Sequence, residues 1–156
     1  EVFFANNQIL FRSEHISFYT RLLEGNYPDT DRLIPTEFNT EATFNVANLR
    51  FAMERARLLS NATQNGTVKL EFKNGVVSSH VHSPEVGRVN EEIDTSAVSG
   101  EDLSISFNPT YLIEALKAID SEQVVIRFIS SVRPFTLVPE GNEQGFIQLI
   151  TPVRTN

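Results

Sequence analysis

Two histidines separated by one residue form the pattern in this sequence that comes nearest to a metal site. In an extended strand, the side chains of His80 and His82 point to the same face, where two imidazoles can bind a divalent ion. No third ligand is recognisable beside them, so two half-exposed strand histidines are the simpler interpretation. We therefore predict no metal site and no cofactor.

Acidic side chains follow in the same segment, at Glu85, Glu91 and Glu92. Such a cluster can serve acid–base chemistry, but it is more often a solvated strand edge or half of an ion-pair interface. The sequence contains no phosphate-binding glycine loop, no nucleophile elbow and no recognisable Ser, His and Asp set. These features predict that the protein is not an enzyme.

The net charge of the chain limits where it can contact nucleic acid. Its 156 residues include 13 Lys and Arg against 20 Asp and Glu, for a net charge of −7. Contact with phosphate must then be confined to a locally basic face. The predicted helix over 46–60 holds three Arg and one Glu, with Arg50 and Arg57 on one flank. This face can accept a duplex, or it is an ordinary exposed helix.

Composition also limits the compartment. The chain has no Cys, in agreement with a reducing compartment, and we expect a cytoplasmic protein. No apolar run approaches the roughly 20 residues of a membrane span, so we predict no membrane partner. Glu1 opens directly onto an apolar run and Met53 is the only Met. We therefore expect a piece of a longer polypeptide.

The first residues of the chain predict strands, and the residues after them predict a repeated unit. Residues 2–5, 8–12 and 16–19 predict a β meander too short to bury its own apolar side chains, so its partner strands are expected upstream. Phe44-Asn45 then opens a helical run, and Phe107-Asn108 opens another 63 residues later. Asn108 is a good N-cap, and Pro109 suits the first helical position.

Each predicted helix has an apolar core face and is followed by strand-like runs. The core faces comprise Leu49, Ala52, Met53 and Ala56 in the first helix, and Leu112, Ala115, Leu116 and Ile119 in the second. The strand-like runs cover 68–72, 76–81 and 86–93 in the first copy, and 124–128, 134–138 and 146–150 in the second. We predict an α+β fold in which a strand–helix–three-strand unit is duplicated, with two helices on one face of antiparallel sheet.

Two apolar features remain outside this core. Phe51 and Leu58 lie away from the core face of the first helix, a position typical of a partner contact. The apolar segment 149–154 is broken by a proline and ends soon afterwards. It is either a last strand with a frayed end or one wall of an apolar groove.

Several short stretches, taken together and in order, resemble the bacterial DNA polymerase III β subunit, the sliding clamp. They are Tyr27-Pro28-Asp29, Arg32 to Pro35, Ala56 to Asn61, Phe107-Asn108-x-x-Tyr111, Ser131 to Phe135, and Thr151 to Arg154. The resemblance implies a DNA clamp fold. It assigns residues 1–36 to the last strands and linker of an incomplete middle domain, and 37–156 to a complete third domain.

The resemblance also implies a function. It predicts a processivity factor that closes as a homodimeric ring around duplex DNA without reading its sequence. The residues expected to face DNA are Arg50, Arg57 and Lys117, and those expected at the subunit interface are Leu58, Leu59, Glu85, Glu91 and Glu92.

A groove between the middle and third domains is a second implication of the resemblance. It binds short linear peptides, with a Gln and a Leu–Phe end, from polymerase, clamp-loader and repair proteins. The matching positions are Pro28, Arg32, Leu33, Asn108, Tyr111, Val132, Pro134, Leu149, Ile150, Thr151, Pro152, Val153 and Arg154. The alternative to a clamp is a non-enzymatic, β-rich ligand- or protein-recognition module that uses the face of His80 and His82.

Overall fold

The chain divides into two compact units, Glu1–Leu33 and Ile34–Asn156. The computed structural model describes residues 1–27, 29–60, 66–83, 87–142 and 145–154. Two of the predicted site residues, Pro28 and Glu85, lie outside the described residues.

The first unit is the predicted antiparallel meander. It consists of β1 (Val2–Phe4), β2 (Gln8–Arg12) and β3 (Ser17–Arg21), and a 3₁₀ turn, η1 (Asp31–Leu33), follows. None of the side chains that are described in this unit is buried, and Leu23 is 96% exposed. The meander therefore has no core of its own, as its length predicts.

The second unit contains the predicted duplication. The first copy consists of β4 (Thr40–Asn45), α1 (Val46–Ser60), β5 (Val68–Lys73), β6 (Val76–Ser83) and β7 (Gly87–Ile93). The second consists of β9 (Leu103–Phe107), α2 (Pro109–Lys117), β10 (Gln123–Phe128), β11 (Phe135–Pro139) and β12 (Gln148–Ile150). Between them lies β8 (Ala97–Gly100), which the sequence pattern does not predict.

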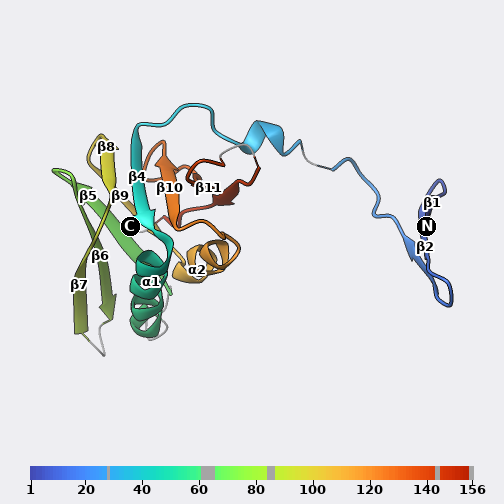
Figure 1. The fold of residues 1–156 in the computed structure, drawn as a ribbon, viewed down its shortest axis with the longest axis horizontal. Coiled ribbons are helices and arrows are strands. Elements are labelled where there is room, and N and C mark those ends of the chain that lie inside the picture. The colour runs from blue at the N-terminus through green and yellow to red at the C-terminus, as the bar shows by residue number, and fades with distance from the viewer. Residues whose placement is uncertain (28, 61–65, 84–86, 143–144, 155–156) are drawn as a thin grey trace. The chain divides into compact units, whose positions relative to one another are not determined.

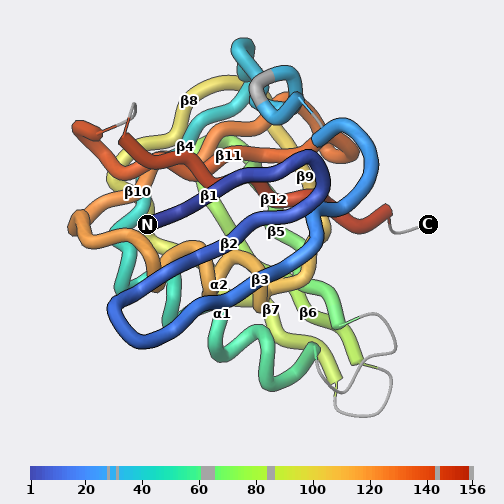
Figure 2. Tube along the Cα trace, turned by 90° about the vertical axis from the view of Figure 1, so that its right-hand side faces the viewer, coloured from blue at the N-terminus to red at the C-terminus, as the bar shows by residue number. Residues whose placement is uncertain are grey.

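The strands of this unit form two antiparallel sheets rather than one. The larger has the order β12-β11-β10-β4-β8 and the smaller β7-β6-β5-β9. Each copy thus gives its first strand to the sheet of the other, because β4 pairs with β10 and β9 pairs with β5. The two helices pack against each other, and α1 also lies along β6 and β7 (Figures 1 and 2).

Both helices begin in the same way. The rings of Phe44 and Phe107 are fully buried, and the asparagine after each caps a helix. Asn45 Oδ1 accepts a hydrogen bond from the Asn48 backbone N–H at 3.1 Å, and Asn108 Oδ1 accepts one from Thr110 at 2.9 Å. In the described part of the chain, neither helix is long and apolar enough to cross a membrane.

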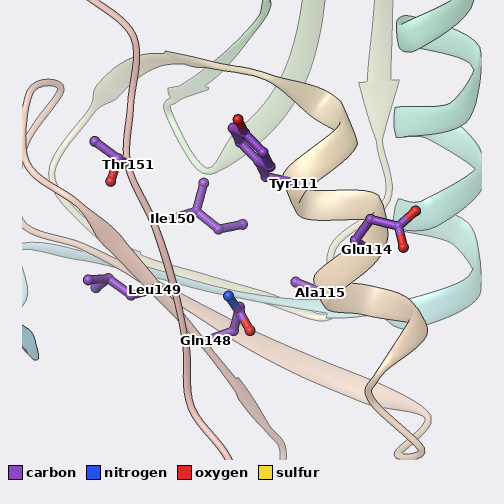
Figure 3. Close-up of a pocket in the computed structure, with 7 residues that line it drawn as sticks. All are labelled: Tyr111, Glu114, Ala115, Gln148, Leu149, Ile150 and Thr151. Carbon is purple, nitrogen blue, oxygen red and sulfur yellow. The ribbon is translucent and has the colours of Figure 1, made fainter. Parts of the chain in front are cut away.

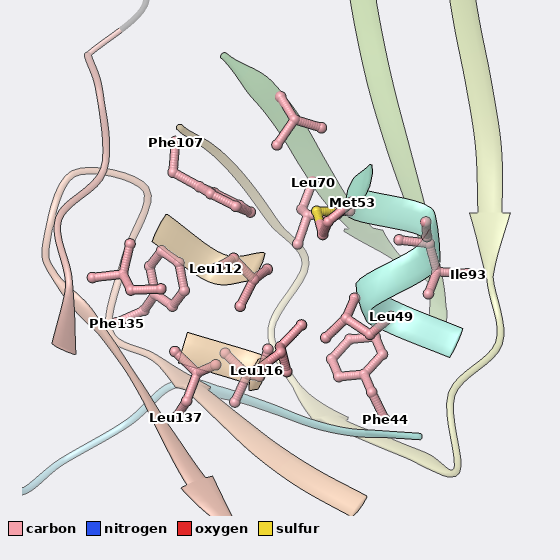
Figure 4. Packing of buried hydrophobic residues seen from close by; sticks show 14 of the residues in the cluster. Phe44, Leu49, Met53, Leu70, Ile93, Phe107, Leu112, Leu116, Phe135 and Leu137 are labelled. Atoms are coloured by element: carbon pink, nitrogen blue, oxygen red, sulfur yellow. The ribbon is translucent and has the colours of Figure 1, made fainter. Parts of the chain in front are cut away.

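Side chains from both copies meet in one core (Figure 4). All eight predicted helical core residues are buried. Four phenylalanines connect the sheets: the ring centroids of Phe72 and Phe128 lie 4.9 Å apart, and both the Phe128–Phe135 and Phe107–Phe135 pairs lie 5.1 Å apart. This aromatic seam joins the first copy to the second.

Candidate functional site

The C-terminal segment connects the two sheets beside the start of α2. Its last strand, β12, pairs with β11, where Ile150 is opposite Phe135. Three residues later, the Val153 backbone N–H donates to the Ser106 carbonyl oxygen of β9 at 2.7 Å. Since Ser106 immediately precedes Phe107-Asn108, this bond holds Val153 next to the capped end of α2.

A hollow of about 540 Å³ lies between α2 and β12. Seven residues line it: Tyr111, Glu114, Ala115, Gln148, Leu149, Ile150 and Thr151. Figure 3 shows the side chains of Gln148 and Ile150 on the helix side of the β12 segment, and those of Leu149 and Thr151 on the other side. Because successive side chains of a strand point to opposite sides, residues from both faces of this segment line the hollow.

The lining combines apolar and polar groups. Ala115 and the buried Ile150 offer apolar surface, while Tyr111, which is 62% exposed, stands at the edge. Glu114 and Gln148 add polar side chains. An apolar hollow with a few polar groups suits a ligand with an apolar side chain and a hydrogen-bonding backbone.

Four residues of the predicted groove lie together in this hollow: Tyr111, Leu149, Ile150 and Thr151. Asn108 caps the turn of α2 that carries Tyr111. The binding role of these residues stays a prediction.

The other groove residues in the second unit lie around β11 and β12. Val132 and Pro134 are in the segment before β11, where Val132 is exposed and Pro134 is half-buried next to Phe135. In the last segment Pro152 is half-buried, and Val153 and Arg154 are exposed. Arg32 and Leu33 belong to the first unit and are exposed there.

Three lining residues are not among the predicted groove residues, namely Glu114, Ala115 and Gln148, of which Ala115 was predicted only as a core residue. Helical periodicity could have found the first two, because they lie three and four residues after Tyr111. Gln148 lies two residues before Ile150 and shares its strand face.

Glu114 is held by basic neighbours. The Lys117 ammonium donates to Glu114 Oε1 at 2.9 Å. This hydrogen bond, together with the charge of Lys117, lowers the pKa of the Glu114 carboxyl, and the charge of Arg57 on α1 adds to the lowering. The carboxylate therefore stays ionised to a lower pH than that of an unpaired glutamate.

Acidic neighbours partly neutralise the charges of two predicted DNA-facing residues, Arg50 and Lys117. Besides the Lys117–Glu114 pair, Arg50 Nε lies 3.7 Å from Glu54 Oε1, and its guanidinium lies 5.2 Å from the centroid of the Phe51 ring. These contacts weaken the positive field of the helices without removing it. Contact between these residues and DNA stays a prediction.

The predicted interface residues differ in their surroundings. Leu58 is 72% exposed, whereas Leu59 is half-buried and packs against the core. Glu91 forms an ion pair with Arg55, whose Nε lies 3.3 Å from Glu91 Oε2, and this hydrogen bond raises the pKa of Arg55. Glu92, the next residue of β7, is exposed. Participation in a subunit contact stays a prediction for all of them.

Contacts with neighbouring side chains explain the position of His80, one of the two predicted strand histidines. His80 and His82 do share the exposed face of β6, opposite the buried Val81. The ring of His80 is occupied on both sides, because Nε2 lies 2.8 Å from Ser78 Oγ and Nδ1 lies 2.8 Å from Asn90 Oδ1. No group of three potential metal ligands occurs within the described ranges. A recognition role for this face stays a prediction.

Comparison with known proteins gives one consistent result. A family model described as the DNA polymerase III beta subunit, C-terminal domain, matches residues 31–154. The chain is 80% identical over 156 residues to a beta sliding clamp of Streptococcus pneumoniae, covering 100% of this chain and 41% of that protein. It is 56% identical over 158 residues to a beta sliding clamp of Lactococcus lactis, covering 100% of this chain and 42% of that protein.

Solved structures agree with the sequence matches. The crystal structure of the DNA polymerase III beta chain from Streptococcus pneumoniae has a TM-score of 0.91 at 79% identity, covering 99% of this chain and 41% of that chain. The sliding clamp from Bacillus subtilis has a TM-score of 0.86 at 38% identity, with the same coverage of 99% and 41%. The chain therefore spans about two fifths of the length of these relatives.

Proposed function

We propose, because this chain belongs to the DNA polymerase III beta subunit family, that it is part of a sliding clamp. In this proposal, the parent protein encircles duplex DNA as a homodimeric ring and increases the processivity of a DNA polymerase in the cytoplasm. It contributes no catalysis of its own and acts as an accessory subunit. The resemblance found in the sequence, and with it the predicted clamp fold, is confirmed by the matches above.

Peptide binding in the hollow between α2 and β12 is the part of this proposal that the present chain supports by itself. Predicted groove residues that are almost 40 positions apart in sequence, Tyr111 and the segment 149–151, line it together. A partner peptide would insert an apolar side chain against Ile150 and Ala115, while Tyr111 offers its hydroxyl to the peptide. Burial of one Leu or Phe side chain contributes about 1.5–3 kcal/mol, so two anchors and a few hydrogen bonds support micromolar affinity.

Loose contact with DNA is the role proposed for Arg50, Arg57 and Lys117. Contacts to phosphate alone are independent of sequence and weaken with salt, as sliding along a duplex requires. Partial pairing with Glu54 and Glu114 supports this role, because it moderates the attraction that would otherwise hold a duplex in one place.

A subunit contact is the role proposed for the outer side of α1 and for β7. The exposed Leu58 offers apolar surface, and Glu92 offers a charge nearby in the fold, since α1 lies along β7. Apolar surface contributes most of the affinity at such an interface, while charges favour the correct orientation and faster association.

Titration of the chain with a fluorescent Gln-x-x-Leu-Phe peptide tests the peptide-binding proposal. We expect saturable, micromolar binding that weakens at least about fivefold in Tyr111→Ala, because this variant loses one side of the hollow. The matched control is Tyr19→Ala, since Tyr19 is similarly exposed but lies in the first unit. Absence of saturable binding, or equal affinities for Tyr111→Ala and the unmodified chain, would contradict the proposal.

A further inference from the structure

Glu114 belongs to two surfaces at once. It lines the hollow with Tyr111 and Gln148, yet its carboxylate is hydrogen-bonded to Lys117 at 2.9 Å. Figure 3 shows that carboxylate extending from α2 away from Ile150, on the side where α1 lies. The residue therefore stands between the hollow and the basic side of the helix pair.

The charge of Glu114 is balanced by the residues proposed to contact phosphate. Lys117 lowers the pKa of Glu114 mainly through a hydrogen bond and also through its charge. The charge of Arg57, on the neighbouring helix α1, adds to the lowering. In the absence of DNA, these two cations offset the carboxylate, so the edge of the hollow has little net negative charge. A phosphate that attracts Lys117 would compete directly with the Lys117–Glu114 hydrogen bond.

We propose that Glu114 couples the two surfaces, so that phosphate contact by Lys117 releases its carboxylate toward the hollow and makes the hollow select peptides with a basic residue beside the apolar anchor. This inference rests on the proposed function of both surfaces. It assigns Glu114 a role in specificity, while the apolar residues of the hollow supply most of the affinity.

The coupling works in both directions. A basic peptide that engages Glu114 frees Lys117 for phosphate, so peptide binding and duplex binding favour each other by the same factor. The factor is small because Glu114 and Lys117 are both well exposed, with side chains 60% and 49% accessible. Exposed ion pairs of this kind support a change of about two- to threefold.

Two fluorescent Gln-x-x-Leu-Phe peptides, identical except for Lys or Glu at one variable position, provide the test. The ratio of their dissociation constants is measured with the whole chain, in the absence and presence of a 20-base-pair duplex. Direct binding of each peptide to the duplex is measured without protein and subtracted. We expect the duplex to shift the ratio about two- to threefold in favour of the Lys peptide.

Variants separate the proposed coupling from general attraction to DNA. In Glu114→Gln, the ratio should be the same with and without duplex. In Lys117→Met, which removes the competing ammonium, the preference for the Lys peptide should be present without duplex. Glu140→Gln, a change at an exposed glutamate outside the hollow, should behave as the unmodified chain does.

The outcomes distinguish this inference from the proposed function. If neither peptide binds, the proposed function fails and the coupling fails with it. Binding of the duplex to the chain is measured in the same samples, and if the duplex does not bind, the proposed contact with DNA fails. If both peptides and the duplex bind but the ratio of the peptide dissociation constants is unchanged, only the coupling is overturned. The coupling is also overturned if Glu114→Gln keeps the duplex-dependent shift, or if Lys117→Met shows no preference without duplex.

Discussion

The two copies of the repeated unit begin alike and end differently. Each has a buried phenylalanine and a capping asparagine before its helix, at Phe44-Asn45 and Phe107-Asn108. However, α1 has 15 residues and α2 has 9, and the last strand of the first copy, β7, has 7 residues against 3 in β12. The shorter copy leaves the hollow beside its helix.

The outer edges of the first strands show the same contrast. The edge of β4 is covered by β8, whereas β9 ends its sheet and receives the Val153 hydrogen bond there. Thus one copy has a closed edge, and the other uses its edge to position the C-terminal segment against α2. In this domain, the candidate site lies where the two copies differ, while the features that they share belong to the common core.

The largest expected effect is at the seam that the copies share. Phe128→Ala removes a fully buried ring that contacts both Phe72 and Phe135, so it should lower the free energy of unfolding by about 3–5 kcal/mol. Denaturant unfolding measures this change. The control is Phe51→Ala, at a ring that is 48% exposed, which should cost less than about 1 kcal/mol. Similar losses in both variants would mean that the seam does not join the copies.

The closed edge of the first copy depends on Gly100. Its φ is +99°, and a Cβ there would lie 2.0 Å from the Asn39 carbonyl oxygen, so Gly100→Ala should destabilise the fold by about 4 kcal/mol. Gly141→Ala is the matched control, because Gly141 also has a positive φ of +77° but has open space around it. We expect about 1 kcal/mol there, measured by thermal unfolding. Equal losses would show that contact between β8 and β4 is unimportant.

The shared helix caps should contribute equally. Asn45→Ala and Asn108→Ala each remove one side-chain acceptor at a helix start, with an expected cost of about 1 kcal/mol. The corresponding serine variants should recover most of that stability. Because Asn108 lies next to the hollow, Asn108→Ala should also weaken peptide binding, whereas Asn45→Ala should not. Equal effects on the peptide would remove the functional contrast between the copies.

The smallest effect concerns a single carboxyl group. Because the hydrogen bond from Lys117 is the main cause of the lowered pKa of Glu114, Lys117→Met should raise that pKa toward its ordinary value. A carboxyl with a lowered pKa stabilises the folded state above its ordinary pKa, and this contribution is lost as the pH falls through the lowered value. NMR titration of the carboxyl carbon measures the change. An unchanged pKa in Lys117→Met would contradict the pairing.

Local patterns predicted the shared parts of the copies well. The Phe-Asn pairs and the spacing of Leu49, Met53, Leu112 and Leu116 depend on nearby residues, and the structure confirms them. The division into two sheets depends on pairing between β4 and β10, whose paired residues lie 78 to 88 positions apart, so no short pattern reveals it. The strand β8 was missed because Val98 is its only large apolar residue, so the segment has no alternating pattern.

The site was only partly predictable for a similar reason. The apolar run 149–154 suggested one wall of a groove, and the resemblance to a family predicted that Tyr111 belongs to the same groove. Glu114 and Gln148 were missed because their importance depends on how α2 and β12 face each other. Spacing within each segment places Glu114 near Tyr111 and Gln148 on the face of Ile150, but it does not reveal that these two faces border one hollow.

Photo-crosslinking tests most directly whether the hollow between α2 and β12 binds partner peptides. A Gln-x-x-Leu-Phe peptide with a photoreactive phenylalanine is irradiated with the chain, and the labelled residues are identified by mass spectrometry. We predict labels concentrated at 111–115 and 148–151, which compete with unlabelled peptide. Competed labels confined to the β5–β6–β7 face around His80 and His82 would contradict the account and favour the recognition module instead.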